Sequence, residues 1–209
     1  MSLGKPILSK ILFQLNEQKA IAAARYLLSE KLHGKANYFK LLKLIFLADR
    51  YHVRNYLRPV TTDRYVAMEH GPVASFLYNV FKGLRASGGQ IRRIPEEHFK
   101  LEAGAKEPNY EYLSQTDIEA LNFAFDHFGH LTKWQLRDLV HAYPEWAQFE
   151  DQLVNQKSVD MSFEDFLENA DPEDKEFKKL RIKDPFPFIT PEEREFLKQE
   201  LIESVHQLT

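Results

Sequence analysis

Two histidines and one aspartate stand in surroundings that suit acid–base chemistry. Asp49 lies in an almost entirely apolar segment, whereas His70 and His141 lie in turn-rich segments close to proline and aromatic residues. A carboxylate and two imidazoles can act as general acid and base when they converge within hydrogen-bonding distance of a substrate. One function class left open is therefore a small hydrolase-type enzyme that uses these three residues.

The aspartate also has a structural interpretation. An unpaired carboxylate in apolar surroundings is costly, so Asp49 is expected to pair with a nearby arginine or to make another local hydrogen bond. The candidates for that pair are Arg50, Arg54 and Arg64. A buried structural pair and a contact to a ligand both remain open for this residue.

The histidines near the helix ends give little support to a metal site. His141 ends a predicted helix, where the helix dipole favours the cationic imidazole, and it can pack under Trp146. His127 and His130 have the spacing of a weak metal pair, but no acidic residue completes a ligand set in sequence. We therefore expect neither a bound transition metal nor another cofactor.

A tight corner displays His70 between two regular elements. Residues 61–63 are short polar residues that can turn the chain, and residues 65–68 read as a short strand. Gly71 permits a backbone conformation closed to other residues, and Pro72 suits the first position of a helix. The sequence therefore predicts a strand, a corner with free backbone N–H groups and then a helix. Such a corner is a candidate binding site.

Hydrophobic periodicity and capping residues predict a mainly α protein. We expect a compact helical domain with a minor β element, a short strand or hairpin, and a C-terminal helical extension. Predicted helices span residues 17–32, 37–55, 72–84, 114–129, 132–141 and 190–202, and residues 90–112 form a hairpin or extended excursion. The predicted helix starts include an N-cap at Asn37, a helix beginning at Ser114, and capping pairs of Thr132 with Gln135 and Thr190 with Glu193. The helix from residue 37 is apolar nearly all round, so it should be central.

Composition narrows the function classes further. The chain lacks cysteine, which excludes thiol catalysis and fits a reducing compartment, and it has no apolar run long enough to span a membrane. There is no GxSxG motif and no phosphate-binding glycine loop. Basic residues occur at Lys40 with Lys43 and at Arg92 with Arg93, but a pI of about 6.3 argues against a dedicated nucleic-acid binder. We expect a cytoplasmic protein that does not bind a membrane.

Charge is divided unevenly along the chain. Residues 1–144 carry 20 Lys and Arg against 14 Asp and Glu, whereas residues 145–209 carry 8 against 17. The acidic C-terminal region is expected to pack on the basic body, held mainly by hydrophobic burial, and to take part in partner choice. We place the main domain at residues 1–150 and an acidic helical extension at residues 151–209.

Three segments together resemble a known family. The segment from Phe39 to Asp49 contains KLxKLxxxAD, the segment 58–78 contains the GPV corner, and the segment 139–146 ends in HxxPxW. This order and spacing resemble the Panacea domain of the SocA-like antitoxins, which often occur in phage-associated and toxin–antitoxin loci. The resemblance covers roughly residues 17–150. The sequence departs from the family pattern between the helix predicted at 72–84 and Ser114, and most of all after Phe149.

The resemblance implies a non-enzymatic protein that neutralises a separately encoded protein toxin by binding it directly. It leaves open the identity of the toxin and whether the protein forms a homodimer. A DNA-binding regulator is a third, weaker interpretation. The residues expected to bind the partner or to form the motif are Lys40, Lys43, Asp49, Asp63, Tyr65, His70, Gly71, Pro72, Tyr78, His141 and Trp146.

Overall fold

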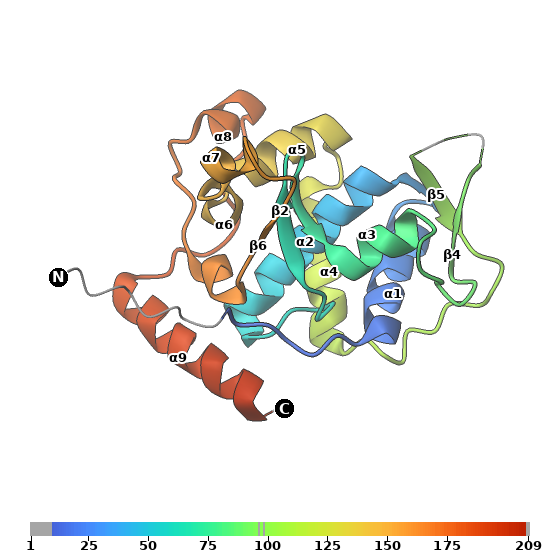
Figure 1. The fold of residues 1–209 in the computed structure, drawn as a ribbon, viewed down its shortest axis with the longest axis horizontal. Helices are drawn as coiled ribbons and strands as arrows, with labels where there is room; N and C mark the ends of the chain where they lie inside the picture. The colour runs from blue at the N-terminus through green and yellow to red at the C-terminus, as the bar shows by residue number, and fades with distance from the viewer. Residues whose placement is uncertain (1–9, 96, 98, 208–209) are drawn as a thin grey trace.

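A long buried helix occupies the centre of the molecule. The computed structural model describes residues 10–95, 97 and 99–207, and its central helix is α2, Tyr38–Tyr56. Figure 1 shows α2 crossing the middle of the fold, with a small sheet and another helix packed against it. The Asn37 side chain accepts a hydrogen bond from the backbone N–H of Phe39 at 3.0 Å, so the predicted N-cap of this helix is confirmed.

The other elements surround α2. The helices are α1 (Glu17–Tyr26), the π-helix η1 (Leu27–Lys31), α3 (Ser75–Phe81), α4 (Gln115–Phe128), α5 (Lys133–His141), α6 (Pro144–Ala147), α7 (Glu150–Leu153), the 3-10 helix η2 (Phe163–Leu167), α8 (Lys175–Leu180) and α9 (Pro191–Gln207). The strands are β1 (Lys35–Asn37), β2 (Tyr65–Met68), β3 (Gly71–Ala74), β4 (Ile91–Arg93), β5 (Lys100–Ala103) and β6 (Val159–Asp160). In Figure 1, β4 and β5 lie at one end of the molecule, and α6 to α9 lie at the other.

The prediction of a mainly α fold with one minor β element is wrong. The fold is mixed α/β, although rich in helix: the described residues are 51% helix and 10% strand, and they form two three-stranded antiparallel sheets in the orders β1-β5-β4 and β3-β2-β6. The strands have two to four residues each, too few to show alternation in the sequence. Moreover, β1 pairs with β5 and β2 pairs with β6, which lie far apart along the chain. The strand β2 was predicted, and β4 and β5 pair within the predicted hairpin or extended excursion, whereas β1 and β6 leave no local signal because their partners are distant.

The prediction that Pro72 begins a helix is also wrong. Pro72 lies in β3 opposite Ala67 of β2, and α3 begins three residues later. The strand β3 is at the edge of its sheet, where a residue without an N–H donor is tolerated. The first turn of α3 is instead capped from a distance, because the Asp63 carboxylate accepts hydrogen bonds from the backbone N–H groups of Phe76 and Leu77 at 3.0 and 2.9 Å. The predicted turn, strand and corner are otherwise present.

Hydrophobic burial attaches the C-terminal region to the rest of the fold. The side chains of Phe163, Phe166, Phe177 and Phe186 are all buried, and β6 extends the sheet of β2. In the final helix α9, Leu201 is fully buried, whereas Phe196 is 61% exposed, so the predicted apolar face of this helix is only partly covered. The capping arrangement predicted for its first turn is present, because Glu193 and Thr190 exchange hydrogen bonds.

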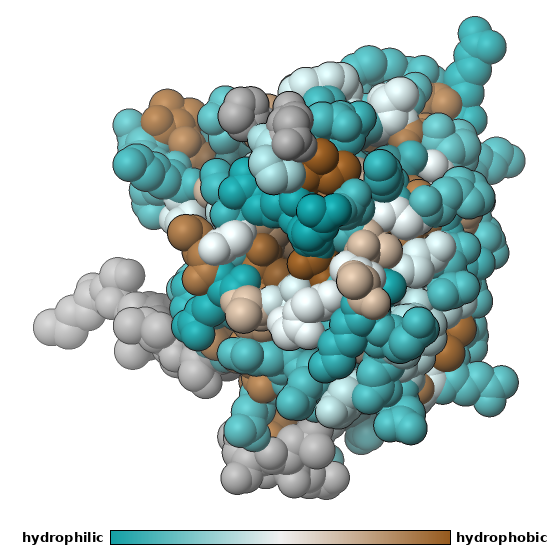
Figure 2. Space-filling model, turned by 90° about the vertical axis from the view of Figure 1, so that its right-hand side faces the viewer, coloured by the Kyte–Doolittle hydropathy of each residue, from teal (hydrophilic) through white to brown (hydrophobic). Residues whose placement is uncertain are grey.

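The surface is mostly hydrophilic at the end that carries β4 and β5. Figure 2 shows hydrophobic residues on this face gathered mainly in a recess near its middle.

Within the described part of the chain, no helix combines the length and the apolar character that a membrane span requires.

Candidate functional site

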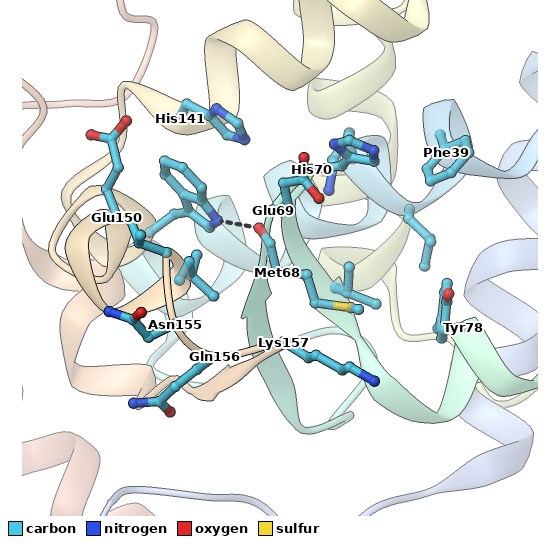
Figure 3. A pocket seen from close by; sticks show the side chains of 16 residues that line it. Phe39, Met68, Glu69, His70, Tyr78, His141, Glu150, Asn155, Gln156 and Lys157 are labelled. Carbon is cyan, nitrogen blue, oxygen red and sulfur yellow. Dashed lines mark hydrogen bonds between the residues drawn. The ribbon is translucent and has the colours of Figure 1, made fainter.

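An open groove lies at the tip of the β2–β3 hairpin. Its volume is about 860 Å³, and it is bounded by the first turns of α2, the end of α5, α6, and the segment from α7 to Lys157. In Figure 3, His141, His70 and Phe39 lie along one side, and Asn155, Gln156 and Lys157 lie along the other. The full lining is Phe39, Leu42, Lys43, Met68, Glu69, His70, Val73, Tyr78, His141, Trp146, Glu150, Leu153, Val154, Asn155, Gln156 and Lys157.

A stacked histidine and tryptophan form one wall of the groove. The ring centroids of His141 and Trp146 are 3.6 Å apart with an interplanar angle of 2°, and Trp146 donates a hydrogen bond to the Met68 carbonyl at 2.9 Å. Burial, followed by the nearby charge of Lys43, lowers the pKa of His141 to about 4. His141 is therefore neutral near pH 7, and the expectation that the helix dipole makes it cationic is wrong because desolvation is the larger effect.

A buried lysine lies at the base of the groove. The side chain of Lys43 is only 2% exposed, and its ammonium donates a hydrogen bond to the Pro72 carbonyl at 2.8 Å. Burial lowers the pKa of Lys43 to about 7. This contact joins the beginning of α2 to the corner that follows β2.

The corner glycine is required by both its conformation and its neighbours. Gly71 has a φ of +98°, which residues with a side chain rarely adopt. A Cβ atom at this position would lie 2.8 Å from Val140 Cγ2 and 3.0 Å from Lys43 Nζ. The structure thus places His70, Gly71, Pro72 and His141 together beside the first turns of α2.

Asp49 does not join the two histidines. It lies nearly two turns beyond Lys43 on α2, where its carboxylate accepts hydrogen bonds from the Thr61 backbone and side chain and from the Tyr65 hydroxyl, the last at 2.8 Å. Burial raises its pKa to about 6. The expected local hydrogen bonds of Asp49 are confirmed, whereas the expectation of an arginine partner is wrong, because Thr61 and the first residue of β2 together supply three donors that satisfy the carboxylate.

The arginines of α2 instead hold the C-terminal region. Arg50 pairs with the buried carboxylate of Glu145 and lies over the rings of Tyr143 and Phe186, at 4.4 and 5.0 Å from their centroids. Arg54 donates to the carbonyls of residues 166, 168 and 187. Sequence reasoning missed this network, because the arginines read as polar interruptions of an apolar helix and their backbone acceptors carry no sequence signal.

The two predicted basic patches are not free cationic surfaces. Lys40 donates to the carbonyls of Gly129 and Leu131 at 2.6 and 2.9 Å, and Lys43 points inward. Arg92 pairs with Glu102, and the neighbouring Arg93 donates to the Lys82 carbonyl at 3.0 Å.

An exposed tryptophan adjoins the groove. Trp134 is 53% exposed and lies under two cations, Lys133 and Arg137, which are 4.8 and 5.2 Å from its ring centroid. A small hollow lined by these three residues also includes Phe39, Lys43 and His70, so it shares a wall with the groove. Sequence reasoning missed Trp134 and the residues 153–157, which carry no recognisable motif.

Within the described residues, no group of three or more His, Asp or Glu side chains could hold a metal ion. His127 is instead hydrogen-bonded through Nδ1 to the carbonyl of Phe123 in the preceding helical turn, at 3.0 Å.

Comparison with known protein families gives a match. The family model described as antitoxin SocA-like, Panacea domain, matches residues 41–147, just over half of the 209 residues. No curated protein and no solved structure matches the chain. The matched range runs from α2 to the end of α6 and contains Lys43, the corner at Gly71, and the His141–Trp146 stack. The chain therefore belongs to the SocA-like antitoxin family and carries its Panacea domain.

Proposed function

We propose that this protein is an antitoxin that neutralises a separately encoded protein toxin by binding it directly in the groove. The family match supports an antitoxin role. The observation that carries the choice of surface is the groove itself, which places apolar side chains, including the exposed Val154, beside the residues of the family motif and next to the exposed Trp134 of the adjoining hollow. Exposed aromatic residues around a concave surface are typical of sites that bind another protein.

The arrangement of ionisable groups favours binding over catalysis. A hydrolase that used Asp49, His70 and His141 would need all three in one pocket, yet Asp49 is saturated with hydrogen bonds elsewhere in the core. The DNA-binding alternative is likewise less well supported, since Lys40 and Lys43 both donate to backbone carbonyls.

The C-terminal region is proposed to adapt the groove to one toxin. Residues 153–157 form one wall of the groove but lie outside the range of the family match. A variable wall on a shared base would let related antitoxins choose different partners. In this proposal, residues 1–150 form the antitoxin domain and residues 151–209 an extension that contributes to specificity, and both toxin and antitoxin meet in the cytoplasm. Formation of a homodimer stays a prediction.

The test is co-expression with the toxin encoded by the neighbouring gene. The wild-type protein is expected to restore growth and to copurify with the toxin. A matched pair of substitutions locates the surface: Val154→Asp changes an apolar groove residue that is 80% exposed, and Phe196→Asp changes a residue of α9 that is 61% exposed. We expect Val154→Asp to abolish rescue and Phe196→Asp to retain it. Absence of rescue by the wild type refutes the antitoxin role, and full rescue by Val154→Asp refutes the choice of surface.

A further inference from the structure

Lys43 is a buried cation that retains unused hydrogen-bond donors. An ammonium group carries three N–H donors, and the only acceptor that it contacts among the described residues is the Pro72 carbonyl. None of the carboxylates in the described ranges forms an ion pair with it. Burying a charge without a counter-ion is costly, and this cost is the reason that the pKa of Lys43 falls to about 7.

The lysine is positioned where an incoming group can reach it. It lines both the groove and the adjoining small hollow, so it forms the base that the two share. The neutral imidazole of His141 lies on the same wall, and its Nε2 atom is buried without a hydrogen-bond partner in the described structure. Two polar groups at the base of one concavity thus have unused hydrogen-bonding capacity.

The acidic residues that line the groove do not lie at its base, so they would not repel an anion that binds there. Glu69 and Glu150 line the groove as well, but both are exposed at its rim. The other lysines and arginines on the same walls are Lys133, Arg137 and Lys157, of which Arg137 pairs with Asp138. A carboxylate reaching Lys43 would therefore pair with a desolvated cation rather than replace an existing ion pair, and such pairs are stronger than exposed ones.

We propose that the base of the groove is a carboxylate-binding subsite, in which an Asp or Glu side chain of the protein toxin pairs with the ammonium of Lys43. This inference rests on the proposed function, because it assigns the toxin to the same groove. The residues flanking that Asp or Glu are expected to be apolar, since Phe39, Met68 and Val154 line the groove around the lysine.

A first experiment examines the subsite without any toxin. Lysine labelled with ¹³C at Cε reports the pKa of Lys43 by NMR, with Lys43→Met identifying its signal. Acetate is the probe, and chloride at equal ionic strength is the control. An anion that binds only the protonated lysine raises its pKa by about 1 when its concentration is ten times its Kd. We expect acetate to raise the pKa and chloride to leave it unchanged. An identical pKa in 100 mM acetate and in chloride would overturn the subsite.

A second experiment uses the complex with the toxin. Lys43→Met should weaken toxin binding at least tenfold, as measured by calorimetry. The control is Lys35→Met, which removes an exposed lysine of β1 that does not line the groove. It should change the Kd by less than twofold. Equal affinities of Lys43→Met and the wild type would refute the pairing.

The toxin side of the pair can be located by double-mutant cycles. Each surface Asp and Glu of the toxin is changed to Asn or Gln and measured against wild type and Lys43→Met. One carboxylate should lose its effect when Lys43 is absent. Coupling to the toxin's terminal carboxylate alone would overturn the assignment to a side chain. If the wild-type protein binds no toxin, the proposed function fails, and the acetate titration still decides whether the subsite exists.

Discussion

Replacing Lys43 by methionine should stabilise the free protein while weakening its function. In the unfolded chain this lysine is protonated below about pH 10.5, whereas in the fold it is protonated only below about pH 7. Between these values folding releases a proton, so the wild-type protein gains stability as the pH rises. Below pH 7 the folded state bears the full free-energy cost of the buried charge, and a methionine side chain of similar length avoids it.

The size of this effect follows from the two pKa values. Their difference corresponds to about 4 to 5 kcal/mol, at roughly 1.4 kcal/mol per pH unit. Against this, the substitution leaves the Pro72 carbonyl without its donor, a loss of about 1 to 3 kcal/mol. Lys43→Met should therefore gain about 2 kcal/mol in the free energy of unfolding below pH 7, or a rise in Tm of about 4 to 8 °C for a chain of this size.

The assay is denaturant unfolding of both proteins between pH 6 and pH 10. The advantage of Lys43→Met should be constant up to about pH 7, shrink above it, and reverse between about pH 8 and 10, where the wild type keeps its hydrogen bond without a charge. Lys40→Met is the control, because Lys40 is less buried and donates to two carbonyls. A Lys43→Met protein that is less stable than the wild type at pH 6 would contradict this reasoning. It would show that the hydrogen bond of Lys43 stabilises the fold by more than its buried charge destabilises it.

Two further substitutions and one deletion test the interactions that stabilise the fold. Gly71→Ala should cost about 2 to 4 kcal/mol, because a φ of +98° is strained for alanine and its Cβ would press on Val140, and chemical denaturation measures the loss. Glu145→Ala leaves Arg50 buried without its carboxylate and should cost about 3 to 5 kcal/mol in the same assay, whereas a loss below 1 kcal/mol would contradict the assigned ion pair. Deleting residues 185–209 removes three buried apolar side chains and should lower Tm in both low and high salt, while a loss confined to low salt would mean that charge holds this region.

Helix starts were the part of the fold that sequence reasoning predicted best. Asn37, Ser114, Thr132 and Thr190 each cap the helix that follows, as expected. Capping depends on residues two or three apart, so its signal is complete within a short segment. The strands β1 and β6 depend on partners far along the chain and were missed, which is why the fold class was wrong.

The candidate site was predictable only in part, for a similar reason. His70, Gly71 and His141 stood out through their residue types and through the motif that contains them, and the structure places them around one groove. The partner of Asp49 was not predictable, since Thr61 satisfies it through a backbone N–H and a hydroxyl that many turns could supply. The role of Lys43 was not predictable either, because no local pattern in the sequence indicates that its ammonium lies inside the fold.

The central claim is that the groove binds the toxin directly, and hydrogen–deuterium exchange on the purified complex tests it most directly. Complex formation should slow amide exchange in the segments that border the groove, at residues 68–72 and 141–157. The β1–β5–β4 sheet, whose residues do not line the groove, should exchange as it does in the free protein. Protection confined to that sheet, or unchanged exchange in both groove segments in a saturated complex, would contradict the assignment of the groove as the toxin-binding surface.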